Sequence, residues 1–293
     1  MNALFKTCYF SLTVFIFLHT TGCGRDEAPR EPLPPIPAPT PDPNLPPRPS
    51  PKPKPPEVKY CVKENVDFSK NGSYRIKTRS AGRIKIMEPV TTDCIRPIMT
   101  FCNGTGASLF FYNEVLRRFA SHGYYVSSYE TAQSGSGKEA LKAVEYAMKQ
   151  KDVSKYKFAA IGHSQGGQCA ASVTYELERK YPDILVASIH GQPAYGMSRA
   201  DYTRILPKIK SPVFAISGSR DTTVPKSWVN RGFPLIKADK VWYEAVGAHH
   251  LNPQSWFATG GLAFSNMVLF EHKKAENYFM GLPLTDYWKV VYQ

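Results

Sequence analysis

The sequence predicts an α/β fold in which residues 58–293 form a single domain, with one mostly parallel, doubly wound sheet flanked by helices. Two observations lead to this prediction. Short apolar runs alternate with amphipathic stretches along the region, as they do where strands are separated by helices and both faces of a sheet are covered. A glycine-flanked serine, Ser164, also lies directly between an apolar run and a helical pattern, which is the place of a sharp strand-to-helix turn.

The expected elements follow in order along the chain. Residues 58–86 contain short strand-like runs with turn signals at Asn71-Gly72 and Ala81-Gly82. Further strands are expected at 97–102, 124–128, 157–161, 184–189, 212–217 and 241–246. Amphipathic helices are expected at 109–122, 138–150 and 168–180, and a closing helix is expected within 255–277.

Ser164 is the centre of the most informative motif, which reads G-x-S-x-G-G. Glycines on both sides of the serine allow a cramped backbone, so the hydroxyl is pushed out above the sheet edge. The N-terminus of the following helix brings free amides and the positive end of its dipole to the same place. This context is that of a nucleophile elbow. The alternative is a serine with only a structural role in a turn.

A serine hydroxyl becomes a good nucleophile when a histidine takes its proton and a carboxylate orients that histidine. In a doubly wound sheet these groups come from loops at the carboxyl ends of later strands. Asp221 and His250 each follow a predicted strand, so the sequence predicts a catalytic set of Ser164, Asp221 and His250. Asp239 is a rival acid, but it precedes a strand. The alternative role for Asp221 is to cap a turn with Thr223.

Two backbone N–H groups are needed to stabilise the negative oxygen that develops during acyl transfer. One is expected from Gln165, directly after the serine. The other is expected from Thr105, in the loop after the strand ending at Cys102, because glycines on both sides let its amide turn inward. A phosphate-binding loop is the competing interpretation of this glycine-rich segment, but no lysine follows it.

Five motifs occur in a fixed order along the chain: Asn103-Gly104-Thr105, Ala120-Ser121-His122-Gly123-Tyr124, Gly162-His163-Ser164-Gln165-Gly166-Gly167, Asp221 with Val224-Pro225, and Gly247-Ala248-His249-His250. With them, residues 98–279 resemble the bacterial cutinase and polyester (PET) hydrolase branch of the α/β-hydrolases, and they are similar to plant chlorophyllases. The resemblance implies an α/β-hydrolase fold and serine esterase activity. It also implies that Thr105 is an oxyanion donor and that His250, not His249, is the base.

The sequence differs from the cutinase and polyester hydrolase branch at positions that form the substrate cleft in that branch. Gln165 stands where the polyester hydrolases commonly have Met, and Pro193-Ala194-Tyr195 stands where their cleft has Pro-Trp. These differences reshape the acyl-binding face. We expect Tyr195 and Trp228 to bind substrate, although both aromatic side chains are equally suited to the core.

The N-terminal region predicts export. Residues 1–22 resemble a lipoprotein-type signal peptide, because an apolar run too short to span a bilayer precedes small residues and Cys23. Residues 23–57 would then be the lipid-anchor cysteine and an extended linker that holds 15 of the 25 prolines. An ordinary cleaved signal peptide is the alternative. We expect a lipid-anchored protein of the bacterial cell envelope, and Gly24 after the anchor favours the outer membrane.

The cysteines indicate disulfides, and the net charge indicates which classes of partner the protein would attract. Cys61, Cys94, Cys102 and Cys169 lie in the domain, and an even number in an exported protein predicts two disulfides. We favour 61–94 with 102–169, although the pairing does not follow from sequence alone. The net charge of +13 would attract anionic polymers or lipids, but the basic residues are scattered, so no nucleic-acid partner is expected.

The function expected from the sequence is hydrolysis of carboxylic esters through an acyl-enzyme. No cofactor and no metal are expected. We expect a monomer that acts on an ester substrate, with polymeric or lipid esters as candidates, and that contacts the membrane through its lipid anchor only. An acyltransferase or a peptidase would use the same three groups and stays open. So does a non-catalytic envelope-binding lipoprotein with a hydrolase fold.

Overall fold

A computed structural model describes residues 58–91, 93–195, 199–251 and 254–292. The predicted signal peptide 1–22, the predicted lipidation site Cys23 and the predicted linker 23–57 lie outside these residues. No helix within the described ranges has both the length and the hydropathy that a membrane span requires.

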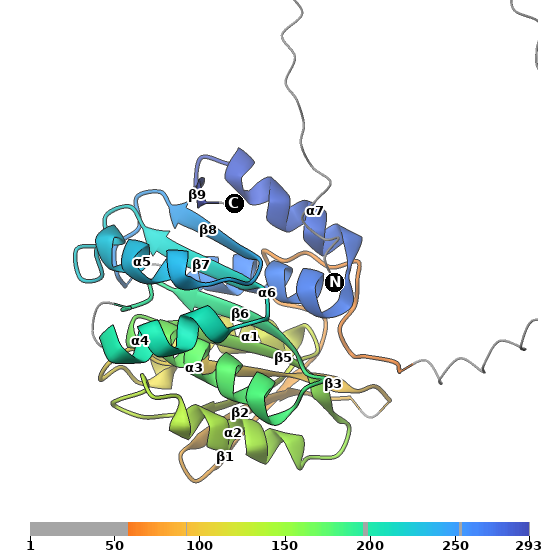
Figure 1. Ribbon diagram of the computed structural model, residues 1–293. Helices are drawn as coiled ribbons and strands as arrows, with labels where there is room; N and C mark the ends of the chain where they lie inside the picture. The colour runs from red at the N-terminus through yellow and green to blue at the C-terminus, as the bar shows by residue number, and fades with distance from the viewer. Residues whose placement is uncertain (1–57, 92, 196–198, 252–253, 293) are drawn as a thin grey trace, which may run out of the picture. The chain divides into compact units, whose positions relative to one another are not determined.

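One nine-stranded sheet organises the described residues, in the order β1-β2-β4-β3-β5-β6-β7-β8-β9 (Figure 1). Neighbouring strands from β4 to β8 in that order are parallel, whereas β1, β2 and β9 pair antiparallel at the two edges. The strands are β1 (Ile76–Ala81), β2 (Ile84–Pro89), β3 (Arg96–Cys102), β4 (Tyr125–Tyr129), β5 (Val153–His163), β6 (Leu185–Gly191), β7 (Val213–Gly218), β8 (Lys240–Ala245) and β9 (Trp288–Tyr292).

Helices cover both faces of the sheet (Figure 1). They are α1 (Asn113–Ser121), α2 (Lys138–Met148), α3 (Gln165–Lys180), α4 (Arg199–Ile205), α5 (Lys226–Gly232), α6 (Gln254–Phe270) and α7 (Lys273–Gly281). One core cluster joins the sheet to α1, α6 and α7, while two clusters on the other face join it to α2 and α3 and to α4 and α5. This arrangement confirms the predicted doubly wound α/β-hydrolase fold.

Strand β7 shows how the sequence produces two buried faces. Phe214 and Ile216 belong to the core under α6, whereas Val213 and Ala215 belong to the core under α4 and α5. Successive side chains of a strand point to opposite faces, so a strand covered on both sides must be apolar throughout. All four of these side chains are fully buried.

The structure extends the sequence prediction in several places. The closing helix is two helices, α6 and α7, separated at Glu271, whose φ of 56° cannot continue an α-helix. The predicted helix 109–122 begins as a single 3-10 turn, Leu109–Tyr112, before α1. Helices α4 and α5 and the edge strand β9 were not predicted from the sequence.

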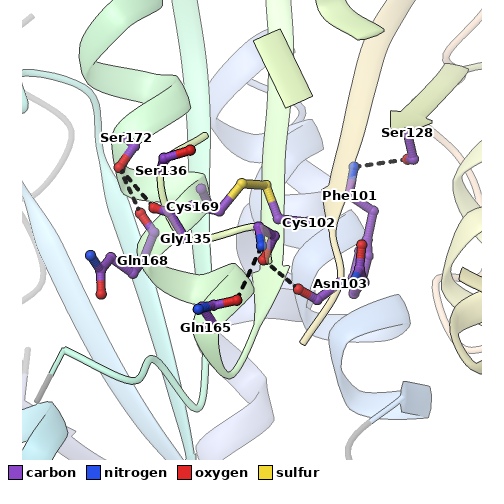
Figure 2. Close-up of a disulfide and its surroundings, with 12 residues drawn as sticks. Phe101, Cys102, Asn103, Ser128, Gly135, Ser136, Gln165, Gln168, Cys169 and Ser172 are labelled. Atoms are coloured by element: carbon purple, nitrogen blue, oxygen red, sulfur yellow. Dashed lines mark hydrogen bonds between the residues drawn. A yellow bond between two sulfur atoms is a disulfide. The ribbon is translucent and has the colours of Figure 1, made fainter. Parts of the chain in front are cut away.

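Two disulfides are present, with the pairing favoured from the sequence. Cys61–Cys94 joins the segment before the sheet to the segment before β3. Cys102–Cys169 joins the end of β3 to α3 (Figure 2). The second bond therefore ties the loop after β3 to the helix that begins directly after Ser164. Disulfides are typical of proteins that leave the reducing cytoplasm.

Candidate active site

The backbone around Ser164 forms a sharp turn between β5 and α3. Ser164 has φ 60° and ψ −122°, a strained conformation for a residue with a side chain. A Cβ atom on Gly162 would lie 1.8 Å from the carbonyl oxygen of Gly166, and one on Gly166 would lie 2.0 Å from the carbonyl oxygen of Cys102. Only glycine fits at these two positions, as the nucleophile-elbow interpretation requires.

Asp221 and His250 meet just beyond the carboxyl ends of two neighbouring parallel strands. Asp221 follows β7 and His250 follows β8, and the Nδ1 atom of His250 lies 2.8 Å from Oδ2 of Asp221. The other carboxylate oxygen, Oδ1, accepts the N–H groups of Thr223 and Val224, each at 2.9 Å. The carboxylate therefore caps the turn and contacts the histidine at the same time. The two roles that the sequence analysis treated as alternatives are compatible.

The other two candidates for this pair lie elsewhere. The imidazole of His249 contacts the carbonyl oxygen of Arg220, at 3.2 Å. Asp239 precedes β8, at the opposite edge of the sheet from Ser164, where its carbonyl accepts the N–H of Val213. His250 and Asp221 are the pair that the structure brings together.

The loop of His250 packs against the elbow. The imidazole rings of His163 and His250 lie 4.7 Å apart between centroids, and His163 directly precedes Ser164. No hydrogen bond joins the Ser164 hydroxyl to His250 in the described part of the chain. Hydrogen bonds between a nucleophile and its base are often long in a free enzyme and tighten when substrate binds.

The two predicted oxyanion donors lie at the ends of neighbouring elements. Gln165 is the first residue of α3, where a helix leaves its N–H groups unpaired. Thr105 is exposed in a turn closed by the hydrogen bond from the N–H of Ala107 to the carbonyl of Gly104, 3.1 Å. Within the described ranges, neither the Thr105 nor the Gln165 N–H donates to a protein acceptor. Both amides are free to bind a ligand oxygen.

The side chain of Gln165 anchors the loop between β4 and α2. Its Oε1 atom accepts the N–H of Ser134 at 3.0 Å, and its Nε2 atom donates to Oε1 of Gln133 at 2.8 Å. The Ser134 hydroxyl in turn donates to the carbonyl of Asn103 at 2.6 Å. Figure 2 shows Gln165 and Asn103 close to the Cys102–Cys169 disulfide. The sequence marks Gln165 as unusual for its position but gives no sign of these contacts.

The buried histidine beside Ser164 was not among the residues predicted from the sequence. His163 is 3% exposed, and burial lowers its pKa to about 4, so the imidazole is neutral. Its Nδ1 atom lies 2.9 Å from the hydroxyl of Tyr112, and its Nε2 atom lies 2.9 Å from both Oε1 of Gln192 and the carbonyl oxygen of His250. Its position inside the G-x-S-x-G motif was the only sequence signal.

One predicted substrate contact is wrong. Tyr195 is completely buried, its ring packs against Gly232, and its hydroxyl hydrogen-bonds Nδ1 of His190. It is therefore a core residue, because the segment after β6 turns inward beneath α5. Trp228, on α5, is half-buried against the same core cluster, and its role in substrate binding stays a prediction.

The described residues contain no group of three or more His, Cys, Asp or Glu side chains arranged to hold a metal ion.

Comparison with known proteins agrees with the fold. Residues 107–245 match the dienelactone hydrolase family. The matched segment contains the elbow at Ser164 and the turn at Asp221, and it ends five residues before His250. No curated protein matches the chain. The sheet and the match together indicate a hydrolase of the α/β-hydrolase type.

Proposed function

From an α/β-hydrolase fold with a segment similar to a hydrolase family, we propose that the protein is a serine carboxylic-ester hydrolase. The observation that supports the proposal is that Ser164, Asp221 and His250 each lie just after the carboxyl end of a parallel strand, β5, β7 and β8 respectively. Ser164 occupies a strained strand-to-helix turn, and His250 contacts Asp221 at 2.8 Å on the loops after β8 and β7. This set of groups is the one that nucleophilic acyl transfer needs.

The reaction begins with proton transfer. Nε2 of His250 takes the proton of the Ser164 hydroxyl as Oγ forms a bond to the ester carbonyl carbon. Asp221 holds the Nδ1–H of His250, which fixes the tautomer and stabilises the imidazolium. Because Oδ1 of Asp221 is held by two backbone N–H groups, the carboxylate has little freedom to turn away.

The negative charge that develops on the carbonyl oxygen is stabilised by the N–H groups of Thr105 and Gln165. The C–O bond to the alcohol then breaks, and His250 gives its proton to the leaving alkoxide. A water molecule attacks the acyl-enzyme in the same way, and Ser164 regains its proton as the acid leaves. Each cycle consumes one water and one ester.

Hydrolysis of p-nitrophenyl esters of graded chain length by the full chain tests the proposal. We expect turnover by the wild-type protein and a loss of at least about 10³-fold in kcat for Ser164→Ala. Ser80→Ala, on the exposed face of edge strand β1, is the matched control and should keep full activity. Equal rates for the wild type and Ser164→Ala would overturn the proposal.

The substrate class is proposed from the resemblance to cutinases and polyester hydrolases. Activity on a polyester film or on lipid esters would support a bulky substrate, and exclusive cleavage of short soluble esters would contradict it. Peptide amides and alcohol acceptors in the same assay distinguish a peptidase or an acyltransferase from an esterase.

We also propose that the protein is exported and anchored through a lipid on Cys23. Two disulfides support an oxidising compartment. The membrane fraction of cells that express the wild type should contain the protein, and Cys23→Ala should release it. Membrane attachment that persists in Cys23→Ala would contradict the lipid anchor.

A further inference from the structure

We propose that Tyr112, His163 and Gln192 form a positioning network that fixes two loops. One is the histidine loop after β8, which carries His249 and His250, and the other is the oxyanion loop after β3, which carries Gly104 and Thr105. We call these three residues the elbow network. The inference rests on the proposed function and adds residues that touch neither substrate nor the reacting atoms. It makes one buried imidazole the common support of two catalytic loops that come from different strands.

On one side, the network holds the backbone of the base. Nε2 of His163 lies 2.9 Å from the carbonyl oxygen of His250, and Nε2 of Gln192 donates to the carbonyl oxygen of His249 at 3.2 Å. Two consecutive carbonyls of the histidine loop are thus bound by two buried side chains. These two bonds act on the backbone of the loop, whereas Asp221 contacts the imidazole of His250 itself.

On the other side, the network holds the oxyanion loop. The Tyr112 hydroxyl accepts the N–H of Gly104 at 3.2 Å and lies 2.9 Å from Nδ1 of His163. Gly104 directly precedes Thr105, whose N–H is the proposed oxyanion donor. A shift in the Tyr112 hydroxyl would therefore move that donor.

The directions of these hydrogen bonds follow from chemistry. Nε2 of His163 faces two oxygens, Oε1 of Gln192 and the carbonyl of His250, so it carries the ring proton. Nδ1 of His163 must then accept, and the hydroxyl of Tyr112 donates to it. Burial raises the pKa of Tyr112 and lowers that of His163, so both side chains stay neutral and this one arrangement persists at all pH values between those two pKa values.

The backbone of Gln192 gives independent support. Gln192 has a φ of 42°, a left-handed conformation that costs a non-glycine residue about 1 to 3 kcal/mol. Its side chain is 1% exposed, and its N–H donates to the carbonyl of Ile216 on β7. Strain of this kind at a buried polar residue is typical of functional sites. In this protein the left-handed backbone of Gln192 directs its side-chain amide toward His163 and the carbonyl oxygen of His249.

The chain contains a matched control for this network. His190, on β6, is also fully buried, and its Nδ1 atom also hydrogen-bonds a tyrosine hydroxyl, that of Tyr195. Its other ring nitrogen contacts Ser188, and no contact of this pair reaches Gly104, His249 or His250 in the described residues. Loss of a buried His–Tyr pair can therefore be compared at two places that differ in their link to the site.

The test combines ester kinetics with amide hydrogen exchange on the full chain. In Tyr112→Phe and His163→Gln we expect kcat to fall about 10- to 100-fold while KM changes less than about threefold, since misplacement of catalytic groups by about 1 Å has this effect. Tyr195→Phe and His190→Gln should keep kcat at temperatures below their melting points. The Gly104 amide should exchange faster in Tyr112→Phe than in Tyr195→Phe.

Two further variants make the test specific. His163→Gln retains an amide N–H near the position of Nε2, so it should be more active than His163→Leu. The double variant of Tyr112→Phe and His163→Leu should lose less activity than the product of the single losses, because both act through one chain of contacts.

Three outcomes would overturn the proposal. The double variant could lose the full product of the two single kcat losses, or Tyr195→Phe and His190→Gln could lose as much kcat as Tyr112→Phe and His163→Gln. The third outcome is an exchange rate of the Gly104 amide in Tyr112→Phe equal to that of the wild type. The exchange measurement needs no turnover, so it separates failure of the network from failure of the esterase proposal. Tyr112→Phe removes one oxygen and keeps the ring, so it serves if the His163 variants do not fold.

Discussion

The carboxylate of Asp221 serves two partners, with Oδ2 at 2.8 Å from Nδ1 of His250 and Oδ1 at 2.9 Å from the N–H of Val224. The turn after β7 thus fixes the carboxylate before substrate arrives. A carboxylate held in this way loses little conformational entropy when the imidazolium forms.

Asp221→Asn separates these two roles. The amide oxygen can still accept the turn N–H groups, while the amide nitrogen would face Nδ1 of His250 and favour the wrong tautomer. We expect kcat to fall by about 10³- to 10⁴-fold with a melting temperature close to that of the wild type. Asp239→Asn, at the other sheet edge, is the control. A small kcat loss in Asp221→Asn would assign Asp221 to the turn alone.

Gly162→Ala should disrupt the elbow. Its Cβ would lie 1.8 Å from the carbonyl oxygen of Gly166, so β5 and α3 would have to separate. We expect loss of activity and destabilisation by about 3 kcal/mol or more, measured by urea unfolding. In Gly281→Ala the added methyl group meets no atom within 4 Å, so stability should be nearly unchanged. A stable, active Gly162→Ala would contradict the geometry of the turn.

The two disulfides should differ in their effect on activity. Each closes a long loop, of 33 residues for Cys61–Cys94 and 67 for Cys102–Cys169, and each should contribute about 4 kcal/mol to stability by loop-closure entropy. Removing Cys102–Cys169 with paired Cys→Ala changes should also lower kcat, because this bond joins the strand before the oxyanion loop to the elbow helix. The 61–94 pair is the control. Equal kcat in both double variants would contradict this role.

Stability should fall as the pH drops below about 6.5. Burial lowers the pKa of His190 to about 3 and that of His163 to about 4, whereas each titrates near 6.5 when exposed. The unfolded chain therefore binds more protons between these values. The free energy of unfolding should decrease with falling pH by about 1.4 kcal/mol per pH unit for each histidine.

Urea midpoints between pH 5 and pH 8 measure this dependence. In His190→Gln, the slope of the free energy of unfolding against pH should be smaller by the contribution of about one proton, since glutamine does not titrate. His122 and His272, whose pKa values burial also lowers, contribute in the same direction and remain in both proteins. A slope unchanged in His190→Gln would show that this imidazole is not neutral in the folded state.

The catalytic candidates could be predicted because their signals are local. Ser164 lies in a motif in which Gly162 is required by the close approach of Gly166, four residues further on. Asp221 and His250 follow apolar runs that are strands. The order of strands in a doubly wound sheet then brings those loops to one edge.

The supporting contacts could not be predicted in this way. Tyr112 lies in the 3-10 turn before α1, His163 at the end of β5 and Gln192 just after β6, and their hydrogen bonds depend on how these parts of the chain pack. Tyr195 was misplaced for the same reason, since its burial depends on α5 and β6. Within the described residues β9 ends the strand order and pairs with β8 alone, so it carries a weaker pattern than the doubly covered strands.

The Cys102–Cys169 bond also changes what proteolysis would do to this molecule. The loop that Gln165 anchors, residues 131–137, lies between the two cysteines and has exposed side chains at Ala132, Gln133 and Ser136. A single cut there would leave two polypeptides, one with Thr105 and one with Ser164, still joined by the Cys102–Cys169 bond. The nicked protein would stay in one piece until a reductant cleaved that bond and released its halves.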